Sequence, residues 1–182
     1  MSGGVKVPVR RGGRDPGLPL PGDDAAVEQL GGALFDRLTA AVARGRAGPA
    51  VLAFFEDGVQ QVDLGPAIER GALVVQQLIA ATSGQPGCLG VAQLAVLHAS
   101  RPDRPSQSFA TVFIELPDNR WWMRWAPAAA GGGPPVAPRT RAAAEGWPKP
   151  NGLGGWFSLA RRAGLRLQLE APGAQAGLHL VH

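Results

Sequence analysis

The segment Arg120–Trp125, Arg-Trp-Trp-Met-Arg-Trp, combines cations and aromatic rings in a form suited to recognition. Side chains of a β-strand alternate between two faces. The odd-numbered side chains, two tryptophans and a methionine, would share one face, and Arg120, Trp122 and Arg124 the other. Such a cation–ring–cation row could stack on bases or on a Pro-rich peptide while arginine binds phosphate or carboxylate. The structural alternative is that the odd-numbered face packs beneath a helix while Trp122 makes cation–π contacts with its flanking arginines.

All five tryptophans lie in the C-terminal third of the chain, where basic residues also gather. Residues 118–182 carry a net charge of +5, against −4 for residues 23–117 and +3 for residues 1–22. A positive surface favours acidic proteins or nucleic acid as partners. The sequence therefore predicts a partner-binding surface made of Arg120, Trp122, Arg124 and Trp147.

Basic residues at other positions suggest nucleic-acid binding as an alternative function, since each can neutralise a phosphate. The candidate phosphate contacts are Lys6, Arg10, Arg11, Arg14, Arg139, Arg141, Arg161 and Arg162. Against this, the sequence has no zinc-finger motif, RNP-type strand motif or recognisable recognition helix. An excess of Arg over Lys, beside abundant Ala and Gly, is also what a GC-rich coding sequence produces.

Residues able to perform acid–base or nucleophilic chemistry are few. His98 near Asp103 could act as a base oriented by a carboxylate, and the neighbouring acids Glu56 and Asp57 form a second candidate pair. Cys88 lies ten residues before His98, about 30 Å along an extended strand, so the two cannot form a dyad. We predict no catalytic residue, no cofactor and no metal site, and a small enzyme centred on His98 is the least favoured function.

Composition limits the class of protein. The chain has 182 residues, 45% of them hydrophobic, which is enough to bury the core of one domain. No apolar run approaches the roughly 20 residues needed to span a bilayer, and the N-terminus lacks the apolar stretch of a signal peptide. A single cysteine excludes an intrachain disulfide and fits a reducing compartment. We therefore expect a cytoplasmic protein without a membrane partner.

Periodicity and turn residues predict the regular elements. Helices are expected from Asp23 or Asp24 to Gly45, over Gly65–Ser83 and over Trp156–Arg162. Strands are expected over Ala50–Phe55, Val59–Leu64, Cys88–His98, Phe109–Leu116, Arg120–Ala126 and Leu165–Glu170. The strand over Cys88–His98 is too uniformly apolar for a half-exposed strand, which indicates a central position with both faces buried.

These elements predict an α+β fold in the order α-β-β-α-β-β-β-(linker)-α-β. It would contain an antiparallel or mixed sheet of five or six strands with two main helices on one face. The distribution of glycine and proline divides the chain into four segments. Residues 1–22 are expected to be a disordered basic tail, 23–126 the α+β core, 127–155 a Gly/Pro-rich connection, and 156–182 a short helix and a strand returning to the core.

The favoured function is a non-catalytic protein-interaction module, an adaptor or assembly subunit. It would bind a protein partner or a second copy of itself through the hairpin that contains residues 120–125 (the Arg/Trp hairpin) and through the basic flexible segments. A nucleic-acid-binding accessory protein using the same surface is the first alternative, and the small enzyme is the second.

Overall fold

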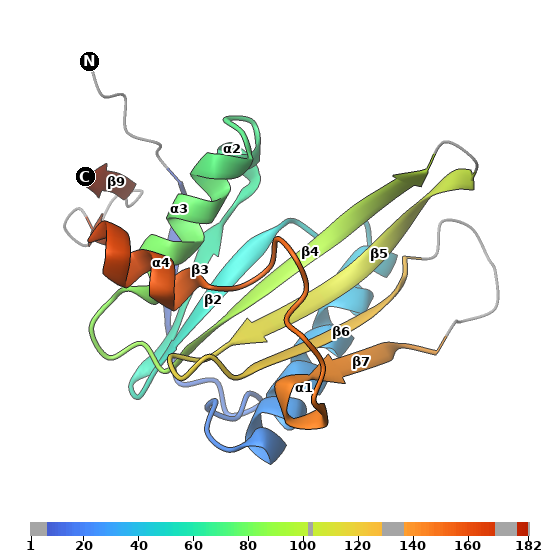
Figure 1. The fold of residues 1–182 in the computed structure, drawn as a ribbon, viewed down its shortest axis with the longest axis horizontal. Helices are drawn as coiled ribbons and strands as arrows, with labels where there is room; N and C mark the ends of the chain where they lie inside the picture. The colour runs from blue at the N-terminus through green and yellow to red at the C-terminus, as the bar shows by residue number, and fades with distance from the viewer. Residues whose placement is uncertain (1–6, 102–103, 129–136, 170–177, 182) are drawn as a thin grey trace.

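Seven antiparallel strands form the main sheet of the computed structural model, in the order β1-β3-β2-β4-β5-β6-β7 (Figure 1). The structure describes residues 7–101, 104–128, 137–169 and 178–181. The strands of this sheet are β1 (Val9–Gly13), β2 (Ala50–Phe55), β3 (Gly58–Asp63), β4 (Gly90–Arg101), β5 (Arg104–Glu115), β6 (Trp121–Pro127) and β7 (Arg139–Ala142). The helices are α1 (Asp24–Ala43), α2 (Gly65–Ile68), α3 (Ala72–Ser83) and α4 (Trp156–Ala163), with a 3₁₀ turn η1 (Ala143–Glu145). The predicted α+β class and antiparallel sheet are confirmed, but within the described residues the sheet has seven strands and there are four α-helices.

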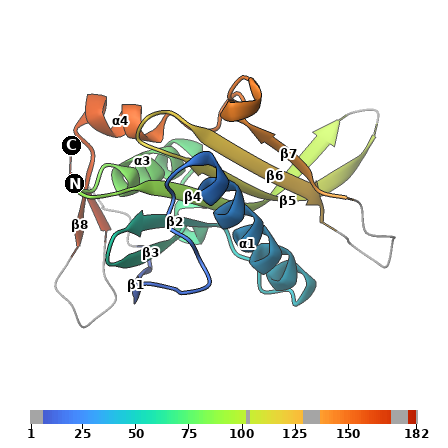
Figure 2. The same cartoon turned by 90° about the horizontal axis from the view of Figure 1, so that it is seen from below.

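Helices cover both faces of the sheet, rather than one as expected (Figure 2). On one face, which we call the α1 face, α1 contacts β5 and β6. On the opposite face, the α3 face, α3 contacts β2 and β4, and α4 packs on α3. Strand β2 requires a covering layer on each side of the sheet, because the side chains on both of its faces are apolar. Leu52 and Phe54 belong to the buried apolar cluster that includes Leu30 of α1, which we call the α1 cluster. Val51 and Ala53 belong to the cluster that includes Leu78 of α3, which we call the α3 cluster.

Helix α1 forms where its sequence signals predict. Oδ1 of Asp23 accepts a hydrogen bond from the Ala26 amide at 2.8 Å, which caps the helix N-terminus. Val27, Leu30 and Leu34 are each at most 4% exposed and pack on the sheet. The three- and four-residue spacing of these apolar side chains thus identifies the buried stripe.

The hairpins β2–β3 and β5–β6 also form as predicted, around the turns at Glu56-Asp57 and Pro117-Asp118-Asn119. Strand β4 occupies the centre of the sheet order, as predicted, but the expected burial of both faces is wrong at its end, where Leu97 and His98 are exposed. Strands β4 and β5 are longer than expected and continue as a hairpin beyond His98 and Phe109.

The helix predicted over residues 65–83 is divided into α2 and α3. Gly71 separates them with a φ of 106°, a conformation that interrupts a helix and favours glycine. Ile68, at the end of α2, is 52% exposed.

The N-terminal segment is not the tail that its Gly, Pro and Arg content indicated. Within residues 7–22, β1 pairs with β3, with Val9 opposite Val62. Val7 and Leu18 are buried in the α3 and α1 clusters, respectively. These few apolar side chains, together with a free sheet edge, are sufficient to order the segment. Residues 1–6 lie outside the described residues.

The C-terminal third also differs from expectation. The connection predicted over residues 127–155 contains β7 and η1. Helix α4 lies on α3, so the following strand β8 (Arg166–Leu169) emerges beside α3. There β8 pairs with β9 (Leu178–Val181) in a separate two-stranded sheet and does not return to the main sheet.

No helix in the described part of the chain is both long and apolar enough to cross a membrane.

Candidate functional site

The side chains of β6 alternate between the two faces of the sheet, as predicted. In an antiparallel sheet, directly paired residues share a face. Trp122 pairs with Ile114 and Ala142, which places it on the α1 face. Met123 pairs with Phe113 and Arg141 on the α3 face. The structural alternative placed the odd-numbered side chains of this strand beneath a helix. In the structure, helix α1 instead covers the side of β6 that carries Trp122.

Trp122, expected in the partner-binding surface, is instead part of the core. It is 3% exposed, and its ring lies directly against the backbone of Gly31 in α1. The guanidinium of Arg124 lies over this ring, with Cζ 5.2 Å from the centroid. Arg124 also donates from Nε to Oγ1 of Thr140 at 3.0 Å. The predicted cation–π contact is therefore present, but Trp122 offers almost no surface to a partner.

Arg120 holds the β5–β6 turn against the start of α1. Its Nε donates to Oδ2 of Asp118 at 2.7 Å, and its Nη1 donates to Oδ1 of Asp24 at 3.2 Å. Both carboxylates are more than half exposed, so these ion pairs orient the guanidinium and contribute little stability. Arg120, Trp122 and Arg124 consequently do not form the exposed row that the alternation suggested.

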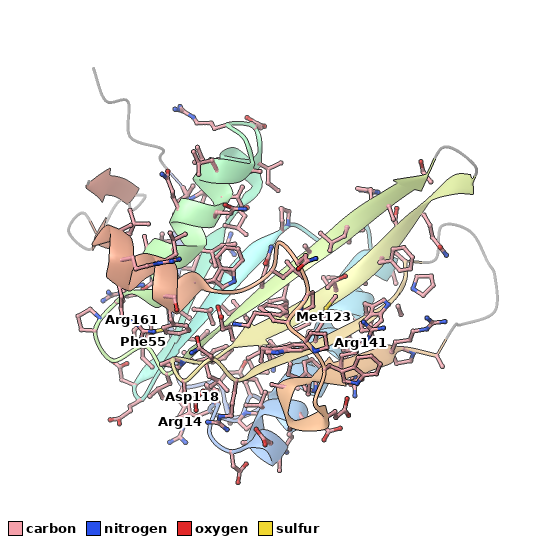
Figure 3. The ribbon with its side chains drawn as sticks, viewed as in Figure 1. Arg14, Phe55, Asp118, Met123, Arg141 and Arg161 are labelled. Carbon is pink, nitrogen blue, oxygen red and sulfur yellow. The ribbon has the colours of Figure 1, made fainter. Side chains whose placement is uncertain are left out.

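The exposed Trp147 and the half-buried Phe109 and Trp125 lie on the other side of the sheet from Trp122. Arg141 of β7 is placed between two indoles, with its Cζ 4.3 Å from the Trp147 centroid and 5.5 Å from that of Trp125. Trp147 is 45% exposed and Leu97 is 39% exposed. Cross-strand pairing places Leu97 opposite Phe109 on the α3 face. We call the following residues the open aromatic face: Leu97, Phe109, Met123, Trp125, Arg141 and Trp147. Figure 3 labels two of them, Met123 on β6 and Arg141 on β7.

A buried carboxylate positions the connection between η1 and α4, which crosses this side of the sheet (Figure 1). Glu115, at the end of β5, is fully buried. Its Oε1 accepts hydrogen bonds from Lys149 Nζ at 2.5 Å and from the Gly155 amide at 2.6 Å. Its Oε2 accepts one from the Trp156 amide at 2.9 Å. The carboxylate thereby satisfies the N-terminus of α4 and complements its dipole.

The crossing connection separates the covered part of the α3 face from the open part. The backbone of Gly154 lies against Phe113 and Glu115. Phe113 stacks on Trp121, with centroids 6.1 Å apart, and both rings are buried. The apolar face predicted for β6 is therefore covered at Trp121 and half-buried at Met123 and Trp125.

Trp147 is the only one of the four predicted partner-binding residues that belongs to this open surface. Sequence reasoning missed Trp125, Met123, Phe109 and Leu97 as surface residues, and it assigned Arg141 to phosphate binding. The strand alternation did group Trp125 with Met123, and that grouping was the available signal. It did not show that the α3 and α4 layer ends before reaching them.

The eight candidate phosphate contacts do not gather on one surface. Arg10 and Arg11 are exposed on β1, with Arg14 just beyond it, whereas Arg139 and Arg141 are exposed on β7. These strands form opposite edges of the sheet, about 29 Å apart at the usual strand spacing. Arg161 and Arg162 are exposed on α4, and Lys6 lies outside the described residues.

The two candidate catalytic centres are separate. Phe54 pairs with Gly90 at the start of β4, so Glu56 and Asp57 lie beyond that end of the strand. His98 lies near the other end, about 27 Å along the strand. It is exposed, and its Nδ1 is 2.8 Å from Oγ of Ser108. Asp103, its suggested orienting carboxylate, lies outside the described residues.

Glu56 and Asp57 border a cleft of about 880 Å³ near the β2–β3 turn. Arg11 and Gln60 also line this cleft. Gln60 is 1% exposed, and its side-chain amide has no hydrogen-bond partner among the described residues. Across the described residues, no group of three His, Cys, Asp or Glu side chains could hold a metal ion.

Cys88 is a buried thiol whose chemistry can be predicted. Burial raises its pKa to about 11, so at pH 8 only about one molecule in a thousand carries the thiolate. We expect 5,5′-dithiobis(2-nitrobenzoate) to modify the native protein at least about tenfold more slowly than the unfolded protein. Equal rates in buffer and in urea, corrected with a free-thiol standard, would contradict this placement of Cys88.

No protein-family model, curated protein or solved structure significantly matches this chain.

Proposed function

We propose that this protein is a non-catalytic protein-interaction module, an adaptor or assembly subunit, that binds through the open aromatic face. The observation that carries the proposal is the stack of Trp125, Arg141 and Trp147 beside a partly exposed apolar surface. Tryptophan and arginine are the residues most enriched among those that dominate binding at protein interfaces. Larger contiguous apolar patches on a protein surface also mark interaction sites, and this face combines the exposed Leu97 and Trp147 with the half-buried Phe109, Met123 and Trp125.

Stacking prepares Arg141 for recognition. Two indoles restrict the guanidinium, so less side-chain entropy is lost when it binds a partner than for a free arginine. The carbon-rich surface around it, which includes the 45%-exposed Trp147, supplies apolar contacts. A partner can therefore combine one charged contact with apolar packing, the arrangement typical of a protein interface.

Photo-crosslinking in the cells that make the protein tests the proposal. A benzophenone amino acid at Leu97 should form an adduct with a second protein, or with a second copy of the chain. The same probe at Leu73, which is 65% exposed on α3, is the matched control and should form at most about a fifth as much adduct. Adding Trp147→Ala or Arg141→Ala to the Leu97 probe should reduce its adduct by about the same factor.

The comparison with Leu73 distinguishes a specific surface from general stickiness. Equal labelling at both positions, or no adduct at Leu97, would exclude the open aromatic face as a protein-binding surface. Adducts made entirely of nucleic acid would support the alternative function instead.

A further inference from the structure

Strand β7 forms one edge of the main sheet and carries two arginines on one face. Arg139 pairs with Trp125 and Arg141 pairs with Met123, so both lie on the α3 face. Among the described residues, β7 pairs only with β6. No other backbone hydrogen bond reaches residues 139–142 there. Within the described part of the chain, the backbone groups of β7 that point away from β6 therefore have no strand partner and can pair with another strand.

The charges of these two arginines are not neutralised within the described part of the chain. Arg37, Arg120 and Lys149 each contact a carboxylate, whereas no ion pair there includes Arg139 or Arg141. Arg141 instead makes contact with two indole faces, which leave the N–H groups at the edge of a guanidinium free to donate. Those donors match the two oxygens of a carboxylate.

We propose that the partner of the open aromatic face is an extended acidic segment that adds to β7 as an eighth strand. This inference rests on the proposed function and specifies its partner. Alternate residues of an added strand point to the same face and lie about 6.7 Å apart, which is also the spacing of Arg139 and Arg141. The segment would therefore carry Asp or Glu at alternate positions, one carboxylate for each arginine. Addition of a strand to a sheet edge is an established mode of peptide binding.

A protein segment fits this edge better than nucleic acid does. The other basic candidates on the opposite sheet edge are about 29 Å away, so no continuous positive track follows a phosphate backbone. Arg141 already covers one face of Trp147, which reduces the indole surface available for base stacking. The adjoining Leu97, Phe109 and Met123 match apolar side chains rather than phosphates.

Strand β1 provides an internal control for edge and charge. It is the other edge strand, and it also carries two exposed arginines, Arg10 and Arg11. These are adjacent residues, so they point to opposite faces and cannot pair with alternate carboxylates on one face. Neither makes a cation–π contact within the described residues. The double variants Arg10→Gln/Arg11→Gln and Arg139→Gln/Arg141→Gln remove the same charge from the two edges.

Fluorescence anisotropy with labelled synthetic peptides tests the proposal on the full chain. The probe is a short peptide in which Glu alternates with Val and Thr, and an isomer of the same composition has its Glu residues contiguous. We expect the alternating peptide to bind at least about fivefold more tightly than the isomer at about 0.1 M salt. Arg139→Gln/Arg141→Gln should weaken binding about tenfold, whereas Arg10→Gln/Arg11→Gln should change it less than about twofold.

Two further measurements separate strand addition from simple charge attraction. Arg141→Lys keeps the charge but loses bidentate geometry, and we expect about threefold weaker binding. Two N-methylated versions of the alternating peptide can be made: one methylated at the backbone nitrogens that would face β7, the other at those that would face solvent. The peptide methylated on the side that faces β7 should lose binding, and the peptide methylated on the solvent side should bind unchanged. Equal effects of the two methylations, or equal losses in the β1 and β7 double variants, would overturn the proposal.

The outcomes also separate this inference from the proposed function. Crosslinking at Leu97 without binding of the alternating peptide would refute the acidic strand and leave the interaction module standing. Failure of both experiments would refute both. Tighter binding of a single-stranded oligonucleotide than of the peptide, lost in the β7 double variant, would overturn the acidic segment in favour of nucleic acid.

Discussion

Replacement of Glu115 by alanine should destabilise the protein by about 3–5 kcal/mol, because the change removes one partner of a buried ion pair. Glu115 is fully buried, and the side chain of Lys149 is only 27% exposed. Without the carboxylate, this ammonium and the amides of Gly155 and Trp156 lose their hydrogen-bond acceptor. Glu115→Gln should cost less, about 2 kcal/mol, since the amide oxygen still accepts one hydrogen bond.

Urea unfolding measures the global effect, and hydrogen exchange measures the local one. The amides of Gly155 and Trp156, which donate directly to Glu115, should both exchange faster in Glu115→Ala, and at least one of them should do so in Glu115→Gln. Glu56→Ala is the control, since Glu56 is exposed at the β2–β3 turn. It should change the free energy of unfolding by less than about 0.5 kcal/mol. A loss below about 1 kcal/mol for Glu115→Ala would show that the carboxylate does not hold α4 in place.

Replacement of Gly31 by alanine should destabilise the protein by about 1–2 kcal/mol, although alanine is the better helix former. A Cβ at position 31 would lie closer than 3.0 Å to the ring of Trp122, which real Cβ atoms essentially never do. Relief requires movement of a ring that is buried between α1 and the sheet, and overpacking of this kind typically costs about 1–3 kcal/mol. That strain outweighs the gain of about 1 kcal/mol in helix propensity.

The adjacent glycine gives a control in the same helix. A Cβ at Gly32 would lie 3.5 Å from Nη1 of Arg124, an ordinary contact with the end of a flexible side chain. Gly32→Ala should therefore stabilise the protein by up to about 1 kcal/mol in thermal or urea unfolding. In a double-mutant cycle, Gly31→Ala should cost less in a Trp122→Leu background, because the ring is absent. Equal effects of the two glycine substitutions would contradict the close packing of Trp122.

The elements that could be predicted from the sequence are those with local signals. Asp23 at the helix start and the apolar stripe from Val27 to Leu38 define α1 without reference to the rest of the chain. The turns at Glu56-Asp57 and Pro117-Asp118-Asn119 similarly define two hairpins, because hairpin pairing requires only neighbouring segments.

The elements that could not be predicted depend on distant partners. Strands β1 and β7 are short and rich in arginine, and they become strands because an edge of the sheet is available to each. Strand β8 looked like a member of the main sheet, but the position of α4 directs it elsewhere. Alternation in a single sequence contains no information of this kind.

The candidate site was predicted only in part for the same reason. Alternation assigned the β6 side chains to two faces, but the burial of one face is decided by α1. The gap that Gly31 leaves in that helix accommodates the Trp122 ring. The neighbours of Arg141 come from β6 and from the segment after η1, so the stack with Trp125 and Trp147 has no local signal.

The division of the core between two sheet faces means that the two halves of the core become complete at different points of chain synthesis. Every buried residue of the α1 cluster lies between Leu18 and Ala126. The α3 cluster also needs Trp156 and Phe157. Since synthesis proceeds from the N-terminus, all the buried residues of the α1 side are present in the chain before Trp156 and Phe157, which complete the other side of the same sheet. Glu115 meets the helix that its carboxylate caps only after α4 (Trp156–Ala163) has also been synthesised.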